Sequence, residues 1–112
     1  MQDKICMVTG ATGGIGEVTA KALARNGATV IVVGRSQTKA AATVEKIKKA
    51  TGNQKVEYML ADLSAQKEVR KLADEFKAKY DRLHVLVNNA GAIYTKREES
   101  VDGIEMMFAL TI

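Results

Sequence analysis

A glycine-rich stretch near the amino terminus is the first part of the sequence that could do chemistry. Residues 9–16 read TGATGGIG and follow a short apolar run, with glycine at Gly10, Gly13, Gly14 and Gly16. Glycine lets a backbone turn sharply and approach a ligand closely, because no β-carbon stands in the way. A helix that begins behind such a turn offers unpaired N–H groups and a partial positive charge. The stretch therefore favours binding of a diphosphate. The spacing G-x-G-x-x-G is absent, and a tight turn without a ligand is the alternative.

Positive charge follows the second apolar run, about twenty residues beyond the glycines. A site for NAD places Asp or Glu there to accept from the ribose hydroxyls, whereas this chain has Gly34 and then Arg35. No acidic residue lies between Glu17 and Glu45. A 2′-phosphate would thus meet a cation and no carboxylate, which favours NADP(H) as the cofactor. Ser36 could add a hydroxyl to this site, or it could cap the following helix.

The elements that position these residues are visible in the hydropathy pattern. Short apolar runs predict four strands, at Ile5–Val8, Val30–Val33, Val56–Leu60 and Leu83–Val87. Most of these runs show almost no alternation, which is typical of strands covered on both faces of a parallel sheet.

Three stretches between the strands carry apolar residues at helical spacing, at 15–23, 40–47 and 69–80. Gly27 and Gly52 are placed to end the first two helices, and Ser64 is placed to cap the third. Residues 102–112 resemble the opening turns of a fourth helix. This alternation predicts an α/β fold, a Rossmann-type doubly wound parallel sheet, with its first four strands and crossover helices in one domain over 1–112.

The composition limits the classes of function. The chain has 112 residues and a net charge of +4, and its basic clusters are expected to be solvated helix faces, so nucleic acid is not an expected partner. Cys6 is the one cysteine and is expected to be buried, which fits a reducing, cytoplasmic compartment. The longest apolar run, Met106–Leu110, is too short for a membrane span. His84 is expected to be a surface histidine, and no metal site is predicted.

Several motifs together resemble the short-chain dehydrogenase/reductase family. The stretch Thr9–Gly16 is similar to its T-G-x-x-x-G-x-G motif, and 88–91 reads NNAG, the family's N-N-A-G, after the fourth strand. Gly13 would also fit the T-G-x-x-G-x-x-G of the sugar-epimerase branch, but N-N-A-G favours the common single-domain branch. The segment 102–109 further resembles the retinol-dehydrogenase-like members.

This resemblance implies a set of residues that bind the cofactor. Asp62 and Leu63 match the pair that contacts adenine, and the backbone of 89–91 would line the ribose. The complete set of candidate cofactor-binding residues is Gly10, Thr12, Gly13, Gly14, Ile15, Gly16, Arg35, Ser36, Asp62, Leu63, Asn89, Ala90 and Gly91.

The family's catalytic residues are absent from these 112 residues. The resemblance implies a Tyr-x-x-x-Lys pair, but Tyr58, Tyr80 and Tyr94 are followed four residues later by Asp, His and Glu. Thr111 stands where the family has its catalytic Asn. The sequence thus resembles the N-terminal half of a reductase about twice as long, whose substrate would be a small-molecule carbonyl or alcohol, and the chain alone is expected to be inactive.

Two other functions remain open at this point. The chain could be a stand-alone, non-catalytic NADP(H)-binding module, or, with less support, a flavodoxin-like or response-regulator-like domain. A fourth strand without a further neighbour would form an open sheet edge, which predicts a homo-oligomer.

Overall fold

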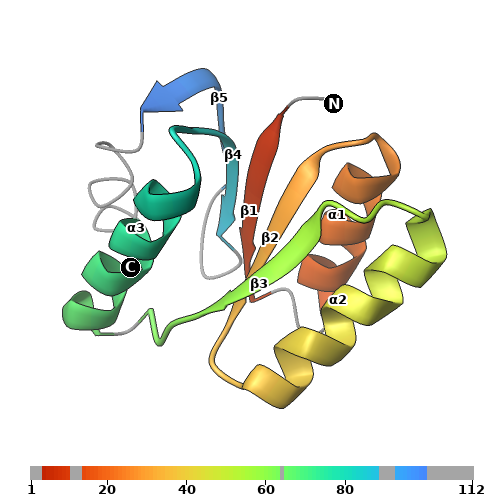
Figure 1. Ribbon diagram of the computed structural model, residues 1–112, viewed down its shortest axis with the longest axis horizontal. Helices are drawn as coiled ribbons and strands as arrows, with labels where there is room; N and C mark the ends of the chain where they lie inside the picture. Colours follow the sequence, from red (N-terminus) through yellow and green to blue (C-terminus); the bar gives the residue numbers. More distant parts are fainter. Residues whose placement is uncertain (1–3, 11–13, 64, 89–92, 101–112) are drawn as a thin grey trace.

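Four parallel strands and three crossover helices alternate along the chain in a computed structural model. It describes residues 4–10, 14–63, 65–88 and 93–100 (Figure 1). The strands of this part are β1 (Ile5–Thr9), β2 (Thr29–Gly34), β3 (Val56–Leu60), β4 (Arg82–Asn88) and β5 (Ile93–Ser100). The helices are α1 (Gly14–Arg25), α2 (Gln37–Thr51) and α3 (Gln66–Lys79). The four predicted strands and the first three predicted helices are confirmed, with bounds that differ by a few residues, and the start of a fourth helix expected at 102–112 lies outside the described residues.

The strand order is β3-β2-β1-β4-β5, so the chain reverses direction across the sheet between β1 and β4. Pairs β1–β2, β1–β4 and β2–β3 are parallel. Figure 1 shows α1 and α2 on one side of the sheet and α3 on the other. This is the predicted doubly wound arrangement, which forms when crossovers before and after the reversal cover opposite faces.

Alternate residues of the same strand supply two hydrophobic cores. On β2, Ile31 and Val33 pack in the core that includes Phe76 of α3, while Val30 and Val32 pack in the core that includes Ile47 of α2. All six side chains are almost fully buried. Successive side chains of a strand point to opposite faces, so a strand covered on both sides must be apolar at every position.

Glycines end the first two helices. Gly52 has φ 75°, and its N–H donates to the Lys48 carbonyl, while Gly27 has φ 88° after α1. Glycine adopts positive φ without the steric penalty that a β-carbon causes in other residues, which explains why both helices end at glycine. The prediction for the third helix start is wrong, because its N-cap residue is Ala65, whose side chain forms no cap hydrogen bond. Ser64 lies outside the described residues.

The sheet does not end at β4, which corrects the expectation of an open edge there. Strand β5 pairs with β4 in the antiparallel direction, with an irregularity between Leu83 and Val85. Its sequence, IYTKREES, is strongly polar and lacks the continuous apolar run of a strand buried on both faces. The expectation of a homo-oligomer therefore loses the open β4 edge as its reason and stays a prediction.

Candidate functional site

The carboxyl ends of the parallel strands meet at one edge of the sheet. Thr9 ends β1 and is in register with Val33 of β2 and with Asn88, the last residue of β4. Gly34 ends β2 opposite Leu60, the last residue of β3. In open α/β sheets, ligands bind outside this edge at the point where the strand order reverses, which here lies between β1 and β4. The described candidate residues that follow β1, β2 and β3 are thus brought to the same edge of the sheet.

Two glycines shape the turn that leaves β1. Gly10 has φ 63°, and its N–H donates to the Val33 carbonyl at 3.2 Å, so the turn is fastened to β2. Gly14, the first residue of α1, has φ 58°. A β-carbon on Gly14 would have no heavy atom within 4 Å, so its backbone angle rather than crowding requires glycine. Gly16 is buried in the first turn of α1, and Ile15 beside it is 80% exposed. Thr12 and Gly13 lie outside the described residues.

Arg35 follows the last residue of β2 and is exposed. Its guanidinium forms no hydrogen bond or ion pair with any residue in the described ranges. Ser36 is the N-cap residue of α2, and its hydroxyl oxygen accepts a hydrogen bond from the Lys39 N–H at 3.3 Å. Capping, the alternative role for Ser36, is therefore observed, whereas a cofactor contact of its hydroxyl stays a prediction.

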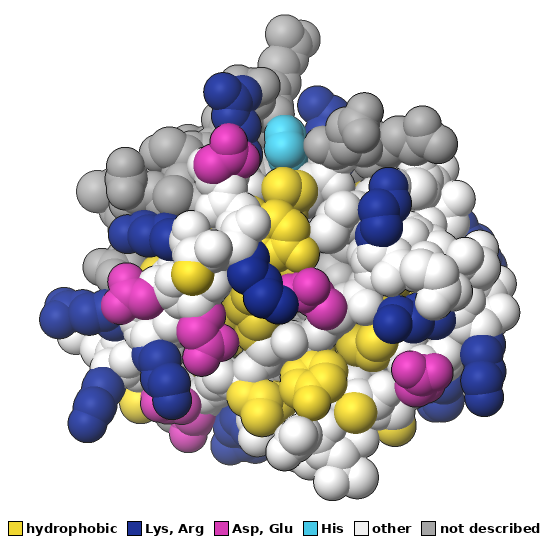
Figure 2. Space-filling view, viewed as in Figure 1, with side chains coloured by type: hydrophobic (Ala, Val, Ile, Leu, Met, Phe, Trp, Pro, Cys, Tyr) yellow, Lys and Arg dark blue, Asp and Glu magenta, His cyan; other side chains and the backbone are white. Residues whose placement is uncertain are grey.

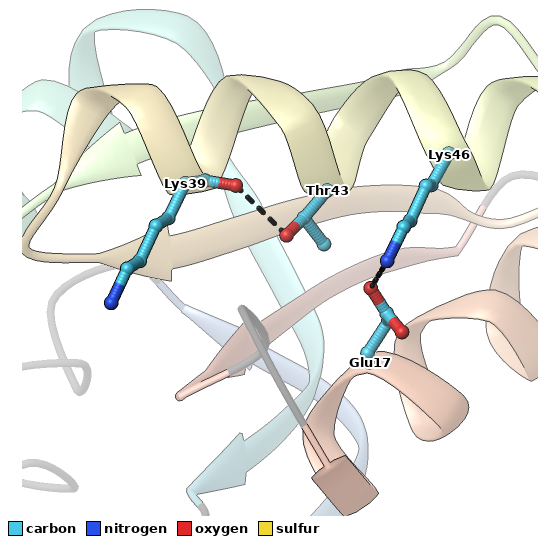
Figure 3. A network of polar contacts seen from close by, with 4 residues as sticks. All are labelled: Glu17, Lys39, Thr43 and Lys46. Atoms are coloured by element: carbon cyan, nitrogen blue, oxygen red, sulfur yellow. Dashed lines mark hydrogen bonds and ion pairs between the residues drawn. The ribbon is translucent and has the colours of Figure 1, made fainter.

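The acidic residue nearest the glycine turn along the chain, Glu17, is held by α2. Its Oε1 lies 3.3 Å from Nζ of Lys46, which joins the first turn of α1 to α2 (Figure 3). The first turn of α2 itself contains no acidic residue. The start of α2 therefore carries cationic side chains, beginning with Arg35, and no acidic ones. The charge of the Glu17 carboxylate on α1 is balanced by Lys46.

The loop after β3 contributes Asp62 and Leu63 at the same edge. The N–H of Ala61 donates to the Gly34 carbonyl at 3.0 Å, so this loop continues alongside the end of β2. Asp62 is half-buried, and its carbonyl accepts from the Ala65 N–H at 3.1 Å. Leu63 is half-buried against the core on the α3 side. Packing accounts for much of Leu63, while Asp62 is placed where the prediction requires it.

The family model described as short chain dehydrogenase matches residues 4–111. The chain belongs to the short-chain dehydrogenase/reductase family.

Individual relatives lie in the branch that the motifs indicated. Human polyprenol dehydrogenase is 44% identical over 108 residues, which are 96% of this chain and 33% of the relative. Human retinol dehydrogenase 11 is 43% identical over 103 residues, 92% of this chain and 32% of the relative. The chain thus spans about a third of the length of these curated relatives. The relatives are therefore about three times as long as this chain, whereas a reductase about twice as long was expected from the sequence.

Solved structures of this family include complexes with the expected type of cofactor. A short chain dehydrogenase from Escherichia coli CFT073 complexed with NADPH superposes with a TM-score of 0.75 at 35% identity, covering 82% of this chain and 39% of that one. A Shigella flexneri 2a str. 301 short chain dehydrogenase complexed with NADP gives a TM-score of 0.73 at 36% identity, covering 82% and 39%. The short-chain dehydrogenase fold is therefore shown, and with it the family's oxidoreductase class.

The remaining site candidates of this short-chain dehydrogenase chain lie outside the described residues. They are Asn89, Ala90, Gly91 and Thr111, together with the segment 102–109 that carried the retinol-dehydrogenase-like resemblance. Asn88 is described as the end of β4. None of the helices in the described ranges has the length and apolarity needed to cross a membrane.

Two titratable groups are buried away from this edge. Burial raises the pKa of the Cys6 thiol to about 11, so this side chain is packing material in β1, as predicted. Burial also raises the pKa of Tyr80 to about 12, helped by the charge of Glu57 and a hydrogen bond to it. Tyr80 packs against Phe76 with ring centroids 5.0 Å apart. A tyrosine held protonated in this way follows α3 and precedes β4, at the end of the sheet opposite the site.

His84 corrects one expectation from the sequence. It is half-buried, and its Nδ1 accepts a hydrogen bond from the Ile5 N–H at 2.9 Å. The side chain thus replaces a backbone acceptor at the start of β1 and is no plain surface histidine. The register between β1 and β4 brings these two residues together, which no local pattern in the sequence indicates.

Proposed function

We propose that this chain is the cofactor-binding part of an NADP(H)-dependent short-chain oxidoreductase that interconverts carbonyl and alcohol groups. The observation that carries the choice of cofactor is Arg35, exposed and unpartnered within the described ranges, directly after β2 at the carboxyl edge. A carboxylate at this place would repel a 2′-phosphate, and a guanidinium binds one through charge-assisted hydrogen bonds. The family complexes with NADPH and NADP support the same choice.

The residues present fit such a cofactor. The positive φ angles of Gly10 and Gly14 bring backbone to the mouth of the β1–α1 turn, where a diphosphate would lie. Arg35 and Ser36 would hold the 2′-phosphate, and Asp62 with Leu63 would lie beside the adenine. The backbone of 89–91 would line the ribose. When bound, NADP(H) supplies or accepts the hydride of the reaction.

These 112 residues supply binding and orientation but no proton donor. No tyrosine in the sequence is followed by lysine four residues later, and Thr111 occupies the position of the family's Asn. A phenol with an ordinary pKa of about 10 is ionised in only about one molecule in a thousand at neutral pH. A neighbouring lysine is therefore needed to activate it. We therefore propose that the chain alone is inactive. In a longer protein, the substrate would be a lipophilic alcohol or carbonyl, as the names polyprenol dehydrogenase and retinol dehydrogenase suggest for the relatives.

The same absence of a Tyr-x-x-x-Lys pair favours a second candidate, a stand-alone NADP(H)-binding module without catalysis. The two proposals differ in what the coding sequence contains after Ile112. A Tyr-x-x-x-Lys pair in the same reading frame supports the oxidoreductase, and a stop codon supports the module.

Calorimetric titration of the chain with NADPH and with NADH tests the choice of cofactor. A charge-assisted contact of Arg35 with the 2′-phosphate, worth about 1.5–3 kcal/mol, predicts a preference for NADPH of about ten- to a hundredfold. Equal affinity for both nucleotides would contradict the assignment of NADP(H). Failure to bind either one at millimolar concentration would contradict nucleotide binding by this chain.

A further inference from the structure

Four cationic residues lie between Glu17 and Glu45, a part of the chain that contains no acidic residue. Their places in the fold divide them into two that lie far from the candidate site and two that lie near it. Lys21 lies in the middle of α1 and Arg25 is its last residue, so both are carried away from the carboxyl edge. Arg35 precedes α2, and Lys39 lies in its first turn. Of these four cations, Arg35 and Lys39 therefore flank the same helix start at the candidate site.

The backbone of Lys39 is held by hydrogen bonds, while its ammonium has no partner among the described residues. Its N–H donates to the Ser36 hydroxyl at 3.3 Å, and its carbonyl accepts from the Thr43 hydroxyl at 2.9 Å. The side chain is exposed, and Nζ forms no hydrogen bond or ion pair within the residues that the structure describes. Figure 3 shows this side chain leaving the first turn of α2 and extending away from the Glu17–Lys46 pair.

Lys46 provides an internal comparison for Lys39. The two lysines are seven residues apart, which is about two helical turns, so they lie on the same side of α2. Lys46 is committed to Glu17 at 3.3 Å, and this pairing leaves no free carboxylate on α1 to attract Lys39 instead. One lysine thus ties the helices together, and the other is left with its charge available at the edge where Arg35 lies.

We propose that Lys39 is the second cation for the 2′-phosphate of NADP(H), and this inference rests on the proposed function. Arg35 offers a planar fork that binds two phosphate oxygens, while Lys39 offers a mobile point charge from the neighbouring turn. A dianionic phosphate has enough acceptor oxygens for both. Because Lys39 is exposed, its contribution is smaller than that of Arg35, about three- to tenfold in affinity.

The test compares Lys39→Ala with a matched lysine at the other end of α2. Lys49 is also exposed, in the last turn, about 15 Å farther along the helix axis, which exceeds the Debye length of about 8 Å at physiological salt. Adenosine 2′,5′-bisphosphate and 5′-AMP are the probes, since they differ only in the 2′-phosphate. Each is titrated into the unaltered chain, Lys39→Ala and Lys49→Ala.

The inference predicts that Lys39→Ala weakens binding of adenosine 2′,5′-bisphosphate by about three- to tenfold and leaves 5′-AMP unchanged. Lys49→Ala should change neither affinity, and added salt should shrink the effect of Lys39→Ala. Unchanged binding of both probes by Lys39→Ala, or equal weakening of both, overturns the role of Lys39 while the proposed function stands. An unaltered chain that prefers 5′-AMP, or binds neither probe, overturns the proposed function itself.

Discussion

The two ends of the parallel sheet are built differently. At the amino end, polar groups satisfy one another: Asn53 bonds to α1 and to its own loop, His84 accepts from Ile5, and Glu57 pairs with Lys79 at 3.2 Å. At the carboxyl end, by contrast, the exposed Arg35 has no hydrogen-bond or ion-pair partner among the described residues. The first arrangement stabilises the chain by itself. The second leaves a cationic side chain without a partner in the described part of the chain, and we propose that this side chain serves binding rather than stability.

Charges of both signs are mixed on one face of the molecule. On the face seen in Figure 2, lysine and arginine side chains of the described residues are interspersed with acidic ones. Interspersed charges of both signs give a weak field over this face, whereas cations without acidic neighbours can attract a phosphate. The local arrangement at Arg35 and Lys39 is therefore more informative than the net charge of +4.

The largest expected effect on stability is at the amino end, at Asn53. Its Nδ2 donates to the carbonyls of Ala24 and Ala28 at 3.0 and 2.8 Å, and its Oδ1 accepts from the Lys55 N–H at 2.8 Å. Asn53→Ala removes three bonds and should lower the free energy of unfolding by about 2–4 kcal/mol.

Urea denaturation measures this change, and NADPH affinity at a temperature where the variant is folded should not move. Asn26→Ala is the matched control, because the exposed Asn26 donates one bond, to the Ala22 carbonyl, and should cost less than about 1 kcal/mol. Equal losses in both variants would contradict the special role of the amino end.

A smaller loss of stability, with a loss of binding, is expected for Gly14→Val at the carboxyl end. At φ 58° a β-branched residue is strained even in open space, which should cost about 1–3 kcal/mol. The backbone would relieve this strain by moving, so NADPH affinity should fall as well.

Gly14→Asn is the control for this position, since asparagine adopts positive φ more readily than other residues with a side chain. The stability of this variant, measured by thermal unfolding, and its NADPH affinity, measured by titration, should lie between those of the unaltered chain and those of Gly14→Val. Valine behaving like glycine in both measurements would show that the turn does not depend on this backbone angle.

The smallest expected effect is a loss of stability at alkaline pH. It comes from Cys6 and Tyr80, which lie away from the carboxyl end of the sheet. Cys6 and Tyr80 keep their protons longer in the folded chain, with pKa values of about 11 and about 12 against ordinary values of 9.0 and 10.0. Above pH 9 the unfolded chain therefore loses protons first, and the free energy of unfolding falls.

The fall between pH 9 and 11 should amount to about 1–2 kcal/mol, because partial exposure of Tyr80 to solvent reduces its share. Urea denaturation at a series of pH values measures it, and below about pH 8 neither group contributes a slope. Cys6→Ala should flatten the decline between pH 9 and 11. An unchanged decline in that variant would rule out Cys6 as its source.

The sequence was sufficient for the parallel part of the fold, because strands buried on both faces must be continuously apolar and the glycines after α1 and α2 end helices visibly. Strand β5 escaped prediction, since its polar sequence has no such pattern and its pairing with β4 is antiparallel. His84 and Asn53 escaped for another reason. Their partners lie far away in the sequence, and only the register of β1 with β4 and the packing of α1 bring them close.

At the candidate site, the sequence predicted the positions of several residues, while their roles toward a cofactor stay predictions. Gly10, Gly14 and Arg35 lie at the carboxyl edge as expected, because motif and strand end coincide in this fold. Ser36 caps a helix and Leu63 packs against a core, which compete with cofactor contacts. A sequence motif does not show whether a residue also has a structural role of this kind, because that role depends on the local geometry.

The affinity ratio of NADPH to NADH after Arg35→Ala tests the central claim most directly. Removing the guanidinium should weaken NADPH binding by about ten- to a hundredfold and leave NADH binding within about twofold, so that only the smaller preference supplied by Lys39 remains, while stability stays unchanged. Weakening of both nucleotides by the same factor, or an unchanged preference for NADPH, would contradict the assignment of Arg35 to the 2′-phosphate.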